Sequence, residues 1–192
     1  MIIENSFSIA APRSEVVAAF LDAERTLSCV PGVTGVTKES EHRYTATLTA
    51  KVGPIKANFA GSVTYDAGQA PEAIRATGEG RDRTSGSVAK VTLDAAFREP
   101  EPGQTHITTR ADLAIRGRLG QFGTGVVQAI ADEMIGSFAR CLEATITGAG
   151  PDQHAATEVS GPSLIGAAAR GLVRGSAARL SGRQPENNEQ SR

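Results

Sequence analysis

Residues 44–66 read YTATLTAKVGPIKANFAGSVTYD, and this stretch decides the fold. Apolar and polar side chains alternate on either side of the central Gly53-Pro54 pair. Because successive side chains of a strand point to opposite faces, the alternation indicates two strands with one apolar face and one face in water. The Gly-Pro pair is a strong turn signal, so the two strands are predicted to form a hairpin.

The same period of two recurs in further segments between residues 33 and 115, which makes six predicted strands. Turn formers gather at residues 67–71 and 99–103, between runs that are long enough to pair with each other. Short connections of this kind join consecutive antiparallel strands. We therefore expect a six-strand antiparallel meander with one face in a core.

The apolar face of these strands is unusually rich in small residues: Ala46, Ala50, Ala57, Gly61, Ala76, Gly78, Ala89, Ala95 and Ala111. Protein interiors are close-packed, so a concave face with such short side chains must be filled by something else. A closely packed helix is one candidate, and a bound apolar molecule is the other. Aromatic residues make up only 4% of the chain and Trp is absent, which favours the ligand. The predicted ligand contacts are Tyr44, Leu48, Phe59, Val63, Val91, Leu93, Leu113, Leu119, Phe122, Val126, Ile130 and Met134.

Helices are predicted on both sides of the meander. Ile2, Ile3, Phe7 and Ile9 indicate a first strand, after which Pro12 suits the first turn of a helix. A second short helix is expected over residues 23–29. Apolar residues then recur at helical spacing over residues 122–147, which predicts an amphipathic helix about 39 Å long that crosses the concave face.

This order of elements resembles the α+β helix-grip fold of the START-like (SRPBCC) superfamily, which is also called Bet v 1-like. Within it, three segments are similar to the CoxG family of carbon monoxide dehydrogenase proteins: FSIAAP at residues 7–12, LSCVPGV at 27–33 and GRLGQFG at 117–123. The resemblance covers residues 1–148. It implies a curved antiparallel sheet, two short helices and one long helix around an apolar cavity.

For the CoxG family the resemblance further implies a non-enzymatic carrier of an isoprenoid quinone such as menaquinone, or of another apolar lipid. The ligand would be held without a covalent bond, and no covalent cofactor is expected. The implied partners are a molybdenum carbon monoxide dehydrogenase-type enzyme, to which electrons or membrane access would be relayed, and the cytoplasmic membrane. We expect the cavity mouth at Val30, Pro31 and Val33.

The composition changes near residue 148, and we predict a ligand-binding domain over residues 1–148 and a flexible linker over 149–162. Residues 163–183 are predicted to be a basic amphipathic segment and 184–192 a disordered tail. On a helix, the former segment has the pattern of a membrane-interface helix; a disordered Ala/Gly/Arg linker is the alternative. The predicted membrane contacts are Leu164, Ile165, Arg170, Leu172, Val173 and Arg174.

Composition limits the partners and the location. The net charge of −1 gives no reason to expect nucleic acid. Strand-like residues follow Met1 directly, and no apolar run is long enough to cross a bilayer, so no signal peptide or transmembrane span is expected. Cys29 and Cys141 are far apart in the sequence and are expected to be free thiols in a reducing cytosol. The predicted location is cytoplasmic, peripheral on the inner face of the membrane.

Catalytic and metal-binding patterns are scarce. His42 and His106 fall on the polar side of strands, and His154 falls in the linker. The cluster Glu79, Arg81, Asp82 and Arg83 is expected to be a solvated hairpin end. A polyketide cyclase or aromatase-like enzyme stays open as an alternative, although Tyr44, Tyr65 and Thr109 are nearly all the polar groups that face inward. The other alternative is an assembly factor for a molybdenum hydroxylase.

Overall fold

A computed structural model describes residues 1–52, 54–148 and 159–160. The elements follow in the order β1 (Ile2–Ile9), α1 (Arg13–Leu21), α2 (Ala23–Ser28), β2 (Val33–Lys38), β3 (Arg43–Val52), β4 (Ile55–Asp66), β5 (Ala73–Asp82), β6 (Ser87–Glu101), β7 (Gln104–Arg116), η1 (Arg118–Gln121), α3 (Thr124–Thr147) and β8 (Val159–Ser160). Apart from β8, the predicted linker, basic segment and tail lie outside the described residues, so their boundaries stay predictions.

The strands form one sheet in the order β1-β7-β6-β5-β4-β3-β2, with every neighbouring pair antiparallel. Strands β2 to β7 are the predicted six-strand meander, which the structure confirms. The first strand, β1, pairs with the last strand of the meander, so β1 and β2 lie at opposite ends of this order. The short β8 adds to β3 in parallel, with Ala50 opposite Val159.

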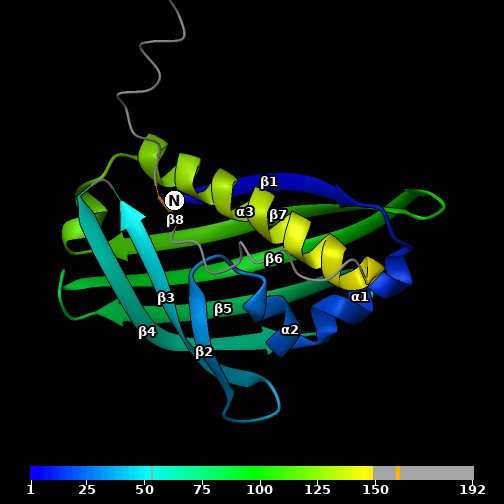
Figure 1. Ribbon diagram of the computed structural model, residues 1–192, viewed down its shortest axis with the longest axis horizontal. Coiled ribbons are helices and arrows are strands. Elements are labelled where there is room, and N and C mark those ends of the chain that lie inside the picture. The colour runs from blue at the N-terminus through cyan, green and yellow to red at the C-terminus, as the bar shows by residue number, and fades with distance from the viewer. Residues whose placement is uncertain (53, 149–158, 161–192) are drawn as a thin grey trace, which may run out of the picture. The chain divides into compact units, whose positions relative to one another are not determined.

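The three α-helices lie on one face of the sheet (Figure 1). Helices α1 and α2 connect β1 to β2, which are distant in the sheet order, and α3 lies across β1, β7 and β6. With 24 residues, α3 is about 36 Å long at 1.5 Å per residue. This is the α+β helix-grip arrangement that the order of elements predicted.

Two predicted helix starts differ from the structure. The long helix begins at Thr124 rather than at Phe122, because Phe122 and Gly123 are extended and a 3-10 turn, η1, precedes them. Pro12 is the N-cap of α1 and not a first-turn residue, since its ψ of 147° is extended. Its carbonyl accepts the N–H groups of Glu15 and Val16 at 3.0 and 3.1 Å, so the helix begins directly after it.

The core contains two clusters at opposite ends of α3. The first joins α1, the last turns of α3 and strands β1, β5, β6 and β7, with Ile9, Ile107 and Leu142 fully buried. Aromatic rings lock this cluster: Phe138 makes edge contacts with Phe7 and Phe20. The second cluster packs η1 and the first turns of α3 against β3 and β4. Each cluster supplies walls to the cavity described below.

Strands β4 and β5 approach each other closely where Gly61 stands opposite Gly80. A Cβ on Gly61 would lie 2.0 Å from the carbonyl oxygen of Glu79, which no side chain can tolerate. Only glycine fits such a close approach of two backbones. Both glycines face the cavity, so this close approach is part of its wall.

The turn between β5 and β6 is held by a buried carboxylate, contrary to the predicted solvated cluster. Glu79, Arg81 and Arg83 are exposed, but Asp82 is only 2% exposed. Its oxygens accept the N–H groups of Thr84 and Ser85 at 3.2 and 2.7 Å. The neighbouring Ser87 hydroxyl accepts the N–H of Leu119 at 3.1 Å, which fixes η1 to this turn. An alternation pattern gives no sign of such a turn, because the carboxylate replaces a backbone acceptor.

Replacing Asp82 with Asn is expected to lower the free energy of unfolding by about 1–3 kcal/mol at pH 7, because buried N–H groups lose a charged acceptor. The Ser85 hydroxyl and the N–H groups of Ser85 and Thr84 hold the pKa of Asp82 below its ordinary value. The carboxylate therefore stabilises the fold above its unfolded pKa of about 3.9, and this stabilisation is lost as the pH falls through the folded pKa. Urea unfolding between pH 2 and 7 measures both effects.

The matched control is Asp94→Asn, since Asp94 is half-exposed in a surface pair with Arg75. We expect a loss below about 1 kcal/mol for this variant. Equal losses in the two variants would contradict the structural role of Asp82.

Candidate functional site

A cavity of about 350 Å³ lies between the sheet and the helices. This volume falls in the usual range for small-molecule pockets, about 300–1,000 Å³. Its walls come from strands β2 to β7, from α1 and α2, from the segment that joins α2 to β2, and from the middle of α3. The walls are almost entirely apolar.

The cavity exists because the strands present short side chains to it. The small residues in its walls are Ala46, Gly61, Ala76, Gly78, Gly80, Ala89 and Ala95. The prediction that small residues surround an unfilled space is therefore confirmed. Ala50, Ala57 and Ala111 are not in the walls; Ala57, for example, is fully buried in the second core cluster.

Part of the predicted ligand-binding set lies in the cavity wall. These residues are Leu48, Phe59, Val63, Val91, Leu93 and Met134, together with the predicted mouth residues Val30, Pro31 and Val33. The strand residues among them follow the period of two, which fixes the face to which each side chain points. Their contact with a ligand stays a prediction.

The other predicted contacts are placed outside the wall: Tyr44, Leu113, Leu119, Phe122, Val126 and Ile130. Leu119 and Ile130 are buried in the second core cluster, and Phe122 and Val126 pack against it. Here the first turns of α3 lie directly on the sheet, so these side chains fill the space between helix and sheet. Tyr44 packs with Ala23 and Leu27 of α2. Leu113 lies on β7, where its N–H bonds to the carbonyl of Met1.

Several wall residues were absent from the predicted set: Phe20, Thr26, Leu27, Tyr65, Ile74, Thr109, Ile135 and Phe138. Phe20 and Phe138 were assigned to helix cores, and the structure shows that each belongs both to the first core cluster and to the cavity wall. Helical periodicity could have identified them as inward-facing. Nothing in the periodicity tells a residue that touches another side chain from one that borders a cavity.

Tyr65 is the polar side chain of the wall whose hydroxyl has no hydrogen-bond partner within the described part of the chain. The hydroxyl of Thr26 donates to the carbonyl of Ala19 at 2.9 Å, and that of Thr109 donates to Asn5 at 3.4 Å. The ring of Tyr65 meets that of Tyr44 edge-on, with centroids 6.1 Å apart. Burial raises the pKa of Tyr65, and Tyr44 raises it further, so its hydroxyl stays protonated at neutral pH and can donate.

Two further wall residues have their polar groups engaged by basic side chains. The Ser62 hydroxyl accepts a hydrogen bond from the Arg43 guanidinium at 2.9 Å, and Glu79 pairs with Lys90 at 3.2 Å. Arg43 and Lys90 occupy the polar side of their strands. The carboxylate of Glu79 is therefore paired at the solvated face of the sheet.

The histidines of the described chain lie outside the cavity wall. His106 Nδ1 is 3.2 Å from the hydroxyl of Ser8, and His42 lies beside Glu41 at the surface. His154 lies outside the described residues. Over residues 1–52 and 54–148, no three His, Cys, Asp or Glu side chains are grouped closely enough to hold a metal ion.

The expectation of two free thiols is wrong. Cys29 and Cys141 form a disulfide across 112 positions of the chain, with their Cα atoms 5.5 Å apart. Both belong to the first core cluster, where the end of α2 and the last turns of α3 pack together. Distance along the sequence gave no measure of this proximity, because the whole meander lies between the two cysteines.

Among the described helices, none has the length and apolar character that a membrane span requires. The predicted membrane contacts Leu164, Ile165, Arg170, Leu172, Val173 and Arg174 lie outside the described residues. Membrane contact by these side chains stays a prediction.

Comparison with known families matches residues 6–147 to the carbon monoxide dehydrogenase family CoxG. Comparison with curated protein sequences gave no match.

Among solved structures, a conserved protein from Geobacillus kaustophilus is similar with a TM-score of 0.71 and 14% identity, over 78% of this chain and 97% of that one. A START superfamily protein from Mycobacterium smegmatis has a TM-score of 0.58 at 15% identity, over 78% and 99%. The Zhui aromatase/cyclase from Streptomyces sp. R1128 has a TM-score of 0.52 at 12% identity, over 79% and 99%. At these identities the likeness concerns the fold alone.

Proposed function

The chain belongs to the CoxG family of carbon monoxide dehydrogenase proteins, and from this premise we propose that it is a non-enzymatic carrier of an apolar ligand that serves a carbon monoxide dehydrogenase. The cavity is the observation that carries the proposal. Its walls are small and aliphatic side chains, and its volume of about 350 Å³ suits a small apolar molecule. The ligand is held without a covalent bond.

The ligand class that fits this cavity best is an isoprenoid quinone of the menaquinone kind. A quinone head is a flat apolar ring with carbonyl oxygens that accept hydrogen bonds. The Tyr65 hydroxyl supplies one donor in an otherwise apolar wall, which matches a ligand with few polar atoms. In this role the protein links a molybdenum carbon monoxide dehydrogenase to the quinone pool, by bringing the enzyme to the membrane or by relaying electrons to the quinone.

The carrier works at the inner face of the cytoplasmic membrane and docks there through its basic tail. Residues 161–183 contain four Arg residues and no acidic residue. Each such charge near an anionic surface contributes about 1 kcal/mol, so docking is reversible and weakens with salt. The full chain should sediment with phosphatidylglycerol vesicles, whereas a chain that ends at Gly148 should not. Equal sedimentation of the two chains would remove the tail from the proposal.

A carrier is favoured over a cyclase by the chemistry of the walls. The aromatase/cyclase from Streptomyces has a similar fold, but the similarity does not extend to function at 12% identity. Acid-base chemistry on a bound polyketide needs polar groups that converge on the substrate. In the described walls the hydroxyls of Thr26 and Thr109 are already bonded to carbonyls, which leaves Tyr65.

Organic extraction of the freshly purified chain, followed by mass spectrometry, tests the proposal. A quinone recovered in stoichiometric amount would support it. An extract without quinone or lipid, from a preparation in which added menaquinone is recovered, would contradict the carrier role. It would favour instead an assembly factor that docks on the enzyme by its outer strand face.

Replacing Tyr65 with Phe is expected to weaken binding of a short-chain menaquinone about threefold to tenfold, the equivalent of one hydrogen bond. Binding of N-phenylnaphthylamine, which has no carbonyl acceptor, should change little. Fluorescence titration measures both affinities. Tyr44→Phe is the matched control, because Tyr44 is buried beside Tyr65 but lies outside the cavity wall. A loss of menaquinone affinity in both variants, or in neither, would contradict the assigned hydrogen bond.

A further inference from the structure

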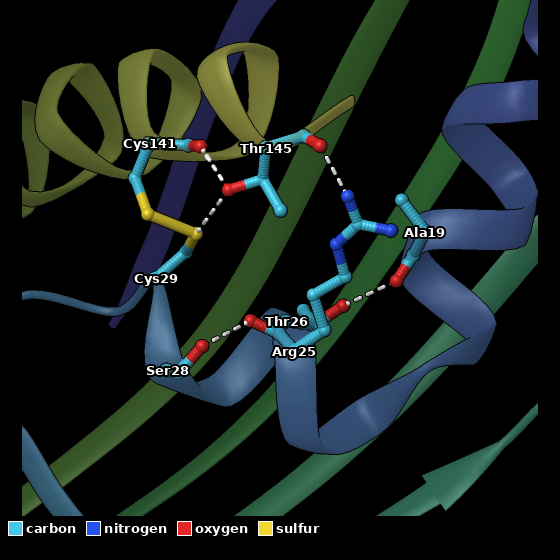
Figure 2. The surroundings of a disulfide bond; sticks show 7 residues. All are labelled: Ala19, Arg25, Thr26, Ser28, Cys29, Cys141 and Thr145. Atoms are coloured by element: carbon cyan, nitrogen blue, oxygen red, sulfur yellow. Dashed lines mark hydrogen bonds between the residues drawn. A yellow bond between two sulfur atoms is a disulfide. The ribbon is translucent and has the colours of Figure 1, made fainter. Parts of the chain in front are cut away.

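The disulfide lies where a helix cap meets the long helix (Figure 2). Cys29 is the C-cap of α2, and Cys141 lies on α3 one turn after Phe138. The two residues are 2% and 9% exposed. The bond is thus a covalent link between two elements that are distant in sequence and that both contribute walls to the cavity.

One end of this link belongs to a segment that forms part of the cavity wall. We name residues 26–33 the α2–β2 segment; its wall residues are Thr26, Leu27, Val30, Pro31 and Val33. At the other end, α3 contributes Met134, Ile135 and Phe138 to the wall. The disulfide therefore fixes the distance between two facing parts of the wall.

Few other bonds hold the α2–β2 segment to α3. The Arg25 guanidinium donates to the carbonyl of Thr145, and Sγ of Cys29 lies 3.8 Å from the Thr145 hydroxyl, as Figure 2 shows. That hydroxyl also donates to the carbonyl of Cys141 at 2.6 Å. These are single hydrogen bonds, which contribute about 0.5–1.5 kcal/mol each.

The remaining bonds of the segment run to other elements. The Thr26 hydroxyl donates to Ala19 of α1, and the N–H of Thr49 on β3 donates to the carbonyl of Gly32 at 2.9 Å. These bonds anchor both ends of the segment independently of α3. Without the disulfide, the segment can therefore move away from α3 while it stays attached to α1 and β3.

We propose that Cys29 and Cys141 form a thiol–disulfide exchange site that controls how fast the ligand enters and leaves the cavity. This inference rests on the proposed carrier function. In the oxidised chain the disulfide holds the α2–β2 segment against α3 and slows ligand exchange. In the reduced chain only the hydrogen bonds of Arg25 and Thr145 remain, and local opening of the wall becomes accessible.

The reductant is a low-molecular-weight thiol or dithiol. Its thiolate attacks one cysteine sulfur, the Cys29–Cys141 bond breaks, and a mixed disulfide forms. A second thiolate releases the cysteine from the mixed disulfide. Two electrons and two protons thus pass to the protein, which gains two thiols while the reductant becomes a disulfide. A low-molecular-weight disulfide reverses the exchange. At the proposed cytoplasmic location, disulfides are mostly transient or redox-sensing, which suits this role.

Dissociation of N-phenylnaphthylamine, measured by stopped-flow fluorescence, tests the inference on the full chain. The oxidised chain is compared with the chain reduced by dithiothreitol, and thiol alkylation with mass spectrometry counts the free cysteines. We expect dissociation about tenfold faster after reduction. The double variant Cys29→Ala with Cys141→Ala should dissociate at the reduced rate and should not respond to dithiothreitol. Hydrogen exchange of residues 26–33 should increase on reduction.

The control for general destabilisation is Ile107→Val, a fully buried residue of the same core cluster. It is expected to cost stability, but its dissociation should remain slow when oxidised and rapid when reduced, as in the original chain. Circular dichroism monitors folding in every sample.

Equal dissociation rates in the oxidised and reduced chains would overturn the exchange site. So would a disulfide that resists dithiothreitol in the folded chain, or a chain that unfolds on reduction, because either result makes the bond purely structural. If N-phenylnaphthylamine binds neither redox form, the proposed carrier function fails instead, and the inference fails with it.

Discussion

Replacing Ala76 with Phe is expected to weaken binding of N-phenylnaphthylamine by about a hundredfold or more. Ala76 lies on β5 between Tyr65 of β4 and Leu93 of β6, and all three side chains border the cavity. A phenyl ring at this position occupies the space that the ligand needs. Since the cavity holds only about 350 Å³, the ring and a bound aromatic molecule exclude each other.

The neighbouring position offers a matched control. Thr77 follows Ala76 on the same strand, is exposed and points to the opposite face. Thr77→Phe adds the same ring outside the cavity and should leave the affinity unchanged. Fluorescence titration measures binding, and urea unfolding verifies that both variants are folded. If Ala76→Phe retained the original affinity, the binding site would lie elsewhere.

Replacing Phe138 with Ala should lower the free energy of unfolding by about 3–5 kcal/mol, the usual cost of truncating a buried Phe. The ring is 9% exposed and makes edge contacts with Phe7 at 6.1 Å and with Phe20 at 5.8 Å. It therefore joins β1, α1 and α3 at one point. The truncation removes contacts in all three directions and enlarges the cavity that the ring borders.

Phe122→Ala is the control for this variant, because Phe122 lies before α3 and is only half-buried. We expect a loss of less than about 2 kcal/mol, since less of this ring is removed from water in the folded state. Urea unfolding at pH 7 compares the two. A larger loss for Phe122→Ala would mean that the second cluster, rather than the aromatic cluster, dominates the stability.

Most of the fold could be predicted from the alternation of side chains. In residues 44–66 the period of two specifies the strands, their apolar face and their turn, and β3 and β4 pair as that pattern requires. Helix boundaries were less accurate, because the cap at Gly123 depends on how η1 is tied to the β5–β6 turn. That tie depends on the buried Asp82 network, which joins residues from separate hairpins and leaves no periodic signal.

The site was predicted at the level of faces but not of depth. Val126, Ile130 and Met134 follow one helical stripe, yet only Met134 borders the cavity, since the first turns of α3 rest on the sheet. Periodicity gives the direction of a side chain, whereas the separation of helix and sheet depends on every residue between them. The disulfide was missed for the same reason, because the position of α2 beside α3 is set by the complete fold.

The volume of the cavity limits how much of a long lipid the protein can enclose. About 350 Å³ is near the lower end for ligand pockets. If the ligand is an isoprenoid quinone with a long chain, the cavity takes its ring and the first part of the chain, and the remainder stays in the bilayer. Apolar surface exposed to water costs about 25 cal/mol per Å². A shuttle that lifts only the ring from the lipid avoids most of that cost and can hand its cargo over at the bilayer surface.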